Sequence, residues 1–262
     1  MAEDILEQIV SHKKDELLEA GRKIPLPELK ETALDNSSSR RSLYKALKNQ
    51  KQVHIIAEIK RASPSKGDIK SDLNPFALAA SYERGGAAAI SVLTDSAFFK
   101  GSIHDLTSAK KATTIPVLRK DFIFSEYQLY EAAAAGADAV LLIVRILSQE
   151  QLSELYGMCK ELSIDALVEV HTESDLQIAR DIGARLIGIN NRNLASFETD
   201  INTATKMAAS LAPGQIAVAA SGISSRMHIE QNLKAGISRF LVGESLLRSE
   251  APEAFLKHLI NG

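Results

Sequence analysis

Short apolar runs alternate with longer amphipathic stretches along most of the chain, with one run about every 20 to 30 residues. Most runs are rich in Val and Ile, and several carry apolar residues at both alternating positions. This pattern is typical of parallel strands that are covered on both faces. It predicts eight strands, at Ile55–Ile59, Ala88–Leu93, Ile115–Leu118, Ala139–Val144, Ala166–Val170, Leu186–Ile189, Ile216–Ala220 and Phe240–Val242.

The amphipathic stretches predict a helix after each strand. Several end just before the next strand in a glycine, which can adopt the left-handed conformation that turns the chain back to the sheet. These glycines are Gly85-Gly86, Gly136, Gly183 and Gly236. The predicted helices are Pro75–Arg84, Ser102–Lys111, Ser125–Ala135, Ser148–Leu162, Glu173–Asp181, Ile201–Ala209, Arg226–Lys234 and Pro252–Ile260.

Eight strands that are each followed by a helix, within roughly 210 residues, match the count of a closed barrel. The alternative is an open, doubly wound sheet, which usually has fewer strands and often carries a Gly-rich fingerprint after the first one. No GxGxxG motif follows the first run here. We therefore predict an α/β protein with a single (β/α)8 TIM barrel over residues 51–262.

Residues 1–50 predict two helices, Asp4–Ala20 and roughly Ser38–Lys48, joined by a segment that contains Pro25 and Pro27. The first helix has an apolar face, formed by Ile5, Leu6, Ile9, Val10, Leu17 and Leu18. Because this segment has too little apolar surface for a core of its own, we expect an N-terminal helical extension that packs on the barrel within one domain, residues 1–262. No basic region precedes an unbroken apolar core, so it is not a secretory signal.

The composition is ordinary for a globular protein, with 45% hydrophobic and 24% charged residues. A net charge of −2 gives no electrostatic reason to expect nucleic acid or a membrane as partner. The most apolar later stretch, Ala132–Val144, is too short to span a bilayer. The single cysteine, Cys159, excludes an internal disulfide and suits a cytoplasmic protein. The sequence leaves monomer and dimer open, and we expect a monomer.

Charged residues at the strand ends indicate chemistry, because barrel enzymes place their active sites there. Glu58 and Lys60 share parity, so both side chains should point into the barrel mouth, although a purely structural ion pair is the alternative. Lys120 shares parity with Leu118, whereas its neighbour Arg119 has the opposite parity. Two adjacent cations at a strand end cannot both be routine core residues.

The fifth and sixth strands add further polar residues. Glu169 is embedded in apolar sequence, and a carboxylate there needs a partner, either a salt bridge within the barrel or a ligand. Asn190 and Arg192 share a face at the end of the sixth strand. Asn191 and Asn193 are also compatible with a simple polar turn.

Two loops have the composition of a phosphate cradle. Ser221–Ser225 follows the seventh strand and Gly243–Ser245 follows the eighth, where phosphate commonly binds in this fold. Small residues let backbone N–H groups approach an anion. A third small, basic loop, Ser63–Gly67, either closes over a ligand or is a surface turn.

The predicted mouth contains more cations than anions. Lys60, Lys120 and Arg192 would repel one another, and Glu58 and Glu169 offset only part of their charge. A ligand that carries a phosphate and a carboxylate would balance the set.

Four segments resemble the indole-3-glycerol phosphate synthase family. The similarity runs in order from about Ile55 to Leu247, and the N-terminal helices also fit the family. The segments are Ile56–Gly67, Val92–Asp95 with Phe98–Ser102, Leu118–Ile123 and Ile187–Leu194. The resemblance implies a lyase of tryptophan biosynthesis that acts on 1-(2-carboxyphenylamino)-1-deoxyribulose 5-phosphate. Such an enzyme closes the indole ring with loss of carbon dioxide and water, and it uses no metal and no organic cofactor.

The resemblance also implies roles for individual residues. Lys120 matches the general acid that protonates the substrate carbonyl, and Glu169 matches the general base of the later dehydration. Lys60 matches the lysine that grips the carboxylate and can exchange with Lys120 as proton donor. The remaining matches orient or bind the substrate: Glu58, Asn190, Arg192, the apolar wall Phe122, and the loop residues Ser63, Ser221, Gly222, Gly243 and Glu244.

One position departs from the family. Relatives commonly have an active-site glutamate before the Ser-Gly of the seventh strand, whereas this chain has Ala220. Two other functions are compatible with a phosphate-binding barrel. A phosphoribosylanthranilate isomerase would use a pair such as Cys and Asp at strand ends, but Cys159 falls within a predicted helix. A non-catalytic barrel that binds a phosphorylated metabolite is favoured by Ala220 and disfavoured by the two lysines and Glu169.

Overall fold

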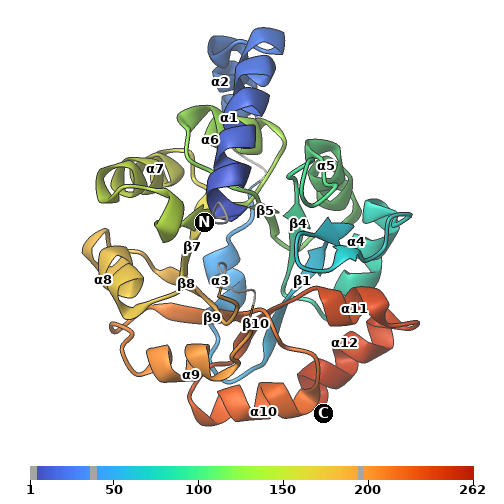
Figure 1. Ribbon diagram of the computed structural model, residues 1–262. Helices are drawn as coiled ribbons and strands as arrows, with labels where there is room; N and C mark the ends of the chain where they lie inside the picture. The colour runs from blue at the N-terminus through green and yellow to red at the C-terminus, as the bar shows by residue number, and fades with distance from the viewer. Residues whose placement is uncertain (1–4, 36–39, 194–197) are drawn as a thin grey trace.

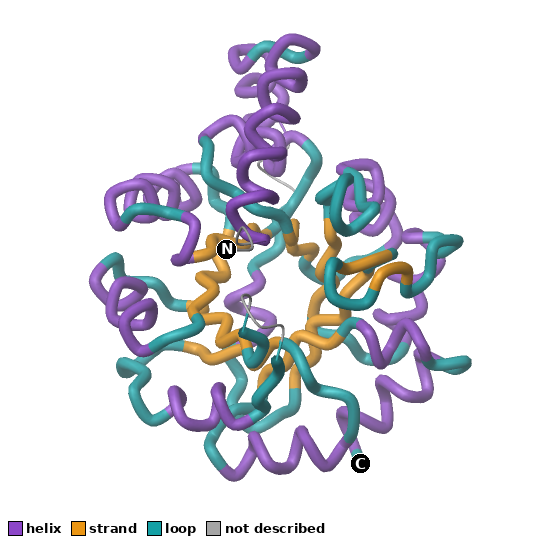
Figure 2. Tube along the Cα trace, viewed as in Figure 1, coloured by secondary structure: helices purple, strands orange, loops and turns teal. Residues whose placement is uncertain are grey.

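The computed structural model describes residues 5–35, 40–193 and 198–262. Eight parallel strands close into a barrel in the order β1-β10-β9-β8-β7-β6-β5-β4, and β4 pairs with β1 to complete the ring. Figure 2 shows this ring of strands from one end, with the helices arranged around it. The predicted (β/α)8 barrel is therefore confirmed.

The barrel strands lie within two residues of their predicted positions. Side chains alternate along each strand, so Ile56 of β1 joins the core inside the barrel while Ala57 and Ile59 pack toward the helices. The strands are β1 (His54–Ile59), β4 (Ala89–Leu93), β5 (Val117–Lys120), β6 (Ala139–Ile143), β7 (Asp165–Val170), β8 (Leu186–Asn190), β9 (Ile216–Ala220) and β10 (Arg239–Val242).

The outer helices begin where the sequence supplies capping side chains. Asn74 accepts a hydrogen bond from the Ala77 amide at the start of one helix, and Ser148 and Thr172 form capping boxes at two others. Gly136 and Gly183 have φ of 83° and 72° after two helices, the left-handed conformation expected at these junctions. The helices are α4 (Pro75–Arg84), α5 (Ile103–Ala112), α6 (Glu126–Ala134), α7 (Gln149–Glu161), α8 (Glu173–Asp181), α9 (Asn202–Ala208), α10 (Arg226–Lys234) and α12 (Pro252–Asn261).

Four short elements were not predicted. A two-stranded hairpin, β2 (Ala62–Ser63) with β3 (Gly67–Asp68), follows β1. The 3-10 helix η2 (Val144–Ile146) follows β6, and the helix α11 (Glu244–Arg248) follows β10. Their brevity leaves no periodic signal in the sequence. Among the described residues, no helix is both long and apolar enough to cross a membrane.

The N-terminal extension contains three helices in its described part: α1 (Ile5–Lys23), α2 (Leu26–Asp35) and α3 (Leu43–Leu47). The segment with Pro25 and Pro27 was expected only to join two helices, but it begins a further helix, α2. Pro27 lies in the first turn of α2, where a missing N–H breaks no helical hydrogen bond. The second predicted helix is shorter than expected, with Ser42 as its N-cap. Asp4, Ser38 and Ser39, which began the two predicted helices, lie outside the described residues.

The extension closes both ends of the barrel. At the end where the strands begin, Arg239 of β10 donates to the Leu47 carbonyl (2.9 Å), and Ser42 donates to Asp165 of β7 (2.8 Å). Leu43 and Leu47 are fully buried there. At the opposite end, Leu6 and Ile9 of α1 pack into the same inner core. In Figure 1, α1 begins near the upper rim of the ring and runs outward to the top of the view, whereas α3 is seen within the ring.

Candidate active site

A cavity of about 440 Å³ opens at the carboxyl ends of the strands. It brings together all twelve residues that the sequence placed at a site, although they come from six strands and the loops that follow them. These are Glu58, Lys60, Ser63, Lys120, Phe122, Glu169, Asn190, Arg192, Ser221, Gly222, Gly243 and Glu244.

Glu58 and Lys60 form an ion pair inside the cavity, with 2.6 Å between Oε1 and Nζ. Burial by itself raises the pKa of Glu58, but the charges of Lys60, Lys120 and Arg192 outweigh that effect and lower it below the ordinary value. Glu58 is therefore ionised at neutral pH. The two side chains form the ion pair that a structural role would require, and the same pair fixes the Lys60 ammonium at the cavity surface.

Glu169 lies among three polar neighbours. Lys120 Nζ lies 3.8 Å from its Oε2, and Asn190 Nδ2 donates to its Oε1 at 3.2 Å. His171 Nε2 lies 3.5 Å from the same Oε1. A cation and a carboxylate thus face the cavity side by side, which suits an acid and a base that act on one substrate.

Arg192 is held by its surroundings. Its amide donates to Asn190 Oδ1 at 3.0 Å, and Nη1 donates to the Ser65 hydroxyl at 2.6 Å. The Ser63–Gly67 loop is therefore tied across the cavity to the end of β8. This favours the ligand-closing interpretation of that loop over a surface turn.

The loop after β9 has an unusual backbone. Ser221 and Gly222 both adopt left-handed φ angles, 68° and 78°, and such strain in a non-glycine residue concentrates at functional sites. Asn191 Nδ2 donates to the Ser221 carbonyl (3.0 Å) and stabilises this turn. A Cβ on Gly222 would lie 2.7 Å from Thr199 Cγ2, so the site requires glycine for space as well as conformation.

The opposite side of the cavity is apolar. The rings of Phe99 and Phe122 lie 5.9 Å apart between their centroids. Helix α1, which was expected only to pack on the barrel, contributes part of this wall. The apolar face of α1 was the feature of the sequence from which this contribution to the cavity could have been predicted. Further lining residues that were not predicted to belong to the site include Ile5, Leu6, Ile9, Leu93, Leu141, Ile143, Leu241 and Arg248.

Arg119, the second cation of the β5 end, points away from the cavity. Its guanidinium donates to Thr94 (3.1 Å), Asp121 (3.1 Å) and Glu131 (2.6 Å). The sequence predicted that Lys120 and Arg119 point to opposite sides of the strand, and the structure agrees: Lys120 faces the cavity, whereas Arg119 has a structural role.

Cys159 lies buried on α7, away from the cavity. Burial raises the pKa of its thiol to about 12, so it is protonated at neutral pH. This position removes the acid–base pair that an isomerase of the phosphoribosylanthranilate type would need. No group of three or more His, Cys, Asp or Glu side chains in the described chain is arranged to hold a metal ion.

Solved structures resemble this fold at low sequence identity. Thiamine phosphate pyrophosphorylase from Pyrococcus furiosus superposes with a TM-score of 0.60 at 17% identity, over 80% of this chain and 94% of that chain. The 3-hexulose-6-phosphate synthase from Salmonella typhimurium gives 0.62 at 12% identity, over 79% and 96%. These similarities support the barrel fold alone.

Sequence relatives are far more similar. An indole-3-glycerol phosphate synthase from Desulfosudis oleivorans is 56% identical over 98% of both chains. One from Syntrophobacter fumaroxidans is 48% identical over 98% of this chain and 97% of its own length. The family model for indole-3-glycerol phosphate synthase matches residues 6–259. The chain therefore belongs to the indole-3-glycerol phosphate synthase family, the decarboxylating lyases that form the indole ring in tryptophan biosynthesis.

Proposed function

We propose that Lys120 is the general acid and Glu169 the general base with which this enzyme closes the indole ring of 1-(2-carboxyphenylamino)-1-deoxyribulose 5-phosphate. The observation that carries this assignment is the 3.8 Å distance between Lys120 Nζ and Glu169 Oε2 at the cavity surface. A proton donor and a proton acceptor within reach of one bound molecule can serve successive steps of one reaction.

The substrate spans the barrel mouth in this proposal. Its phosphate binds the loops after β9 and β10, at Ser221, Gly222 and Gly243, with Ser63 and Glu244 at the edge of the cavity. Strand β5 lies on the opposite side of the barrel from β9. A substrate whose phosphate binds after β9 therefore extends across the barrel mouth, and its aromatic ring reaches Lys120 and Phe122. The Phe99–Phe122 wall and the apolar residues of α1 suit an aromatic ring at that end.

Ring closure joins the aromatic carbon that carries the carboxylate to the carbonyl carbon of the sugar chain. Lys120 delivers a proton to the carbonyl oxygen as this bond forms, and carbon dioxide leaves with cleavage of the carbon–carboxylate bond. Lys60 and Arg192 hold the carboxylate beforehand. Glu58 keeps Lys60 in place through the 2.6 Å ion pair.

Dehydration completes the indole. Glu169 takes a proton from the ring intermediate, and the hydroxyl leaves as water with a proton from a lysine, a role in which Lys60 can exchange with Lys120. Asn190 orients Glu169 through the 3.2 Å hydrogen bond. Because Lys120 and Glu169 are neighbours, a proton can pass from Glu169 to Lys120, directly or through one water. Loss of carbon dioxide from a carboxylate consumes one proton overall, so the second proton that the lysines donate is replaced from solvent before the next turnover.

We further propose that the enzyme is a cytoplasmic monomer and that residues 1–262 form one domain. All twelve candidate site residues of one chain meet at the same cavity, so the site needs no residue from a second copy, which supports a functional monomer. Leu6, Ile9, Leu43 and Leu47 share a core with the inner strand residues, which supports one folding unit. Sedimentation analysis of the purified protein tests the monomer, and one cooperative unfolding transition tests the single domain.

The role of Lys120 is tested with Lys120→Ala, and Lys111→Ala on the exposed end of α5 is its control. Formation of the indole product is followed by fluorescence, with no metal added. We expect Lys120→Ala to lose about 10²- to 10⁴-fold in kcat, the usual contribution of a general acid, while inorganic phosphate still binds. Turnover of Lys120→Ala near the wild-type rate would refute the assignment.

A further inference from the structure

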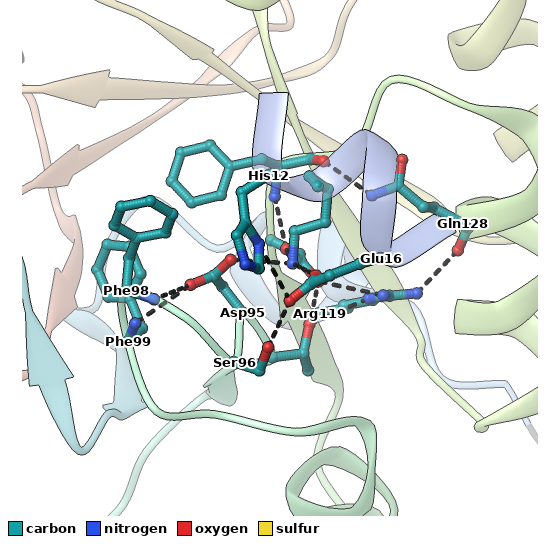
Figure 3. Close-up of polar contacts among 12 residues, drawn as sticks. His12, Glu16, Asp95, Ser96, Phe98, Phe99, Arg119 and Gln128 are labelled. Atoms are coloured by element: carbon teal, nitrogen blue, oxygen red, sulfur yellow. Dashed lines mark hydrogen bonds and ion pairs between the residues drawn. The ribbon is translucent and has the colours of Figure 1, made fainter. Parts of the chain in front are cut away.

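Lys13 of α1 is a buried lysine that does not line the substrate cavity. Only 4% of the residue is exposed. Its Nζ lies 2.9 Å from Asp95 Oδ2, 3.3 Å from Asp121 Oδ1 and 2.5 Å from Glu16 Oε2. Figure 3 shows Asp95, Glu16 and Arg119 gathered beneath α1, next to Phe98 and Phe99. A cation in this position joins the N-terminal helix to the carboxyl ends of two barrel strands.

The two aspartates each fix an aromatic residue of the cavity wall. Asp121, which directly follows Lys120, accepts a hydrogen bond from the Phe122 amide at 2.8 Å. Asp95, which follows β4, accepts from the amides of Phe98 (2.7 Å) and Phe99 (3.2 Å). The rings of Phe99 and Phe122 then pack against each other. The positions of both rings thus depend on two buried carboxylates.

The charge of Lys13 is needed where it lies. Within the described chain, Asp95 has its only ion pair with Lys13, whereas Asp121 also pairs with Arg119. A buried carboxylate without a compensating cation is unfavourable and tends to rearrange. Burial lowers the pKa of Lys13, but Asp121, Asp95 and Glu16 together raise it by more, so the side chain is charged at neutral pH.

The same helix carries part of the cavity wall. Ile9 lies one turn before Lys13 on α1, and Leu6 lies about one further turn before it, on the same side of the helix. Docking of Lys13 between Asp95 and Asp121 therefore sets where Leu6 and Ile9 sit over the cavity. One ammonium group controls both the helical and the aromatic parts of the apolar wall.

We propose that Lys13 is a positioning residue for ring closure, which fixes the aromatic end of the substrate site through Asp95, Asp121 and α1. The inference rests on the proposed function, in which the substrate ring lies against Phe122. It assigns no contact between Lys13 and the substrate. It requires that loss of Lys13 weakens binding at the aromatic end and spares the phosphate end, which lies across the barrel.

The test compares Lys13→Met with Lys14→Met, a matched change at an exposed position of the same helix. The measurements are kcat and KM for the substrate, and competitive inhibition by anthranilate and by inorganic phosphate, which probe the two ends separately. For Lys13→Met we expect KM and the anthranilate inhibition constant to rise about tenfold each, which corresponds to about 1.4 kcal/mol of binding free energy. The phosphate constant should change less than about twofold, and Lys13→Arg, which keeps the charge, should recover part of the loss.

A purely structural lysine would alter stability without changing the ratio of the two inhibition constants. Equal effects on anthranilate and phosphate, or no effect on either, would overturn the inference. If anthranilate does not compete with substrate even in the wild-type enzyme, the proposed substrate orientation fails first, and the role of Lys13 fails with it.

A measurement on the wild-type enzyme covers the case in which Lys13→Met does not fold. Hydrogen exchange of the α1 amides is followed with saturating anthranilate and, separately, with saturating phosphate. We expect anthranilate to slow exchange in the turns that carry Ile9 and Lys13, and phosphate to leave it unchanged. Equal exchange with and without anthranilate would contradict coupling of α1 to the aromatic end.

Discussion

Gly243 lies directly against the carboxylate of Glu58, so that a single carbon atom added to Gly243 would overlap with Oε1. The φ angle of Gly243 is −127°, a value open to any residue. Glycine is therefore needed here for space and not for conformation. The contact joins the loop after β10 to the ion pair that positions Lys60.

We predict that Gly243→Ala lowers kcat/KM by at least about tenfold, because a displaced Glu58 no longer holds Lys60. The effect is measured as initial rates of indole fluorescence. Gly157→Ala is the control, since a Cβ there meets nothing within 4 Å and alanine suits the interior of α7. A Gly243→Ala enzyme with wild-type kcat/KM would show that the Glu58–Lys60 pair is unimportant for the reaction.

Ala220 stands where the family resemblance implies an active-site glutamate, so the cavity has one carboxylate fewer than that pattern implies. Its side chain lines the same cavity as Lys60 and Lys120. We predict that Ala220→Glu moves the basic limb of the pH profile of kcat/KM to higher pH, because a nearby carboxylate favours the charged forms of cations in the cavity. Ala220→Gln has the same size without the charge, and superimposable profiles for the two variants would contradict the prediction.

His171 links pH to stability. Its side chain is 7% exposed, and both ring nitrogens lack a hydrogen bond within the described residues. Burial lowers the pKa of His171 below 6.5, and Arg145 and Lys120 lower it further, against the opposing effects of Glu169 and Asp175. As pH falls below 6.5, the unfolded state binds the proton first, so the contribution of neutral His171 to stability is present above this pH and is lost below it.

We therefore predict that His171→Asn loses less unfolding free energy than the wild type between pH 7 and pH 5, by at most about 1.4 kcal/mol per pH unit. Urea denaturation at several pH values measures this difference. His104→Asn, at an exposed position of α5, serves as the control. A His171→Asn curve that runs parallel to the wild-type curve would mean that His171 does not titrate in this range.

Leu47 is fully buried in the core inside the barrel, at the end that faces away from the cavity. We predict that Leu47→Ala lowers the free energy of unfolding by about 2–5 kcal/mol, the usual cost of a large-to-small change in a core. The kcat of the folded enzyme should stay close to wild type, because Leu47 does not line the cavity. Leu34→Ala, at a residue that is 65% exposed, should change stability little. A small effect of Leu47→Ala would argue against one folding unit.

The sequence by itself determined the barrel and which charged side chains at the strand ends face its mouth. Parallel strands covered on both faces leave unbroken apolar runs, so each of the eight barrel strands could be located from local pattern. Parity along β1 and β5 then separated Glu58, Lys60 and Lys120, which face the cavity, from Arg119, which does not. These features are local because side-chain direction follows from position within a single strand.

Only the tertiary structure decided how distant segments complete the cavity. The pairing of Lys13 with Asp95 and Asp121 joins residues more than 80 positions apart, and the contact of Gly243 with Glu58 joins the two ends of the barrel sequence. The helix α2 was also missed from the sequence, because Pro25 and Pro27 stand at its start and were taken for a connection between two other helices. Such contacts depend on closure of the ring, which brings the first and last strands together and places α1 over the mouth. No spacing within one element encodes that geometry.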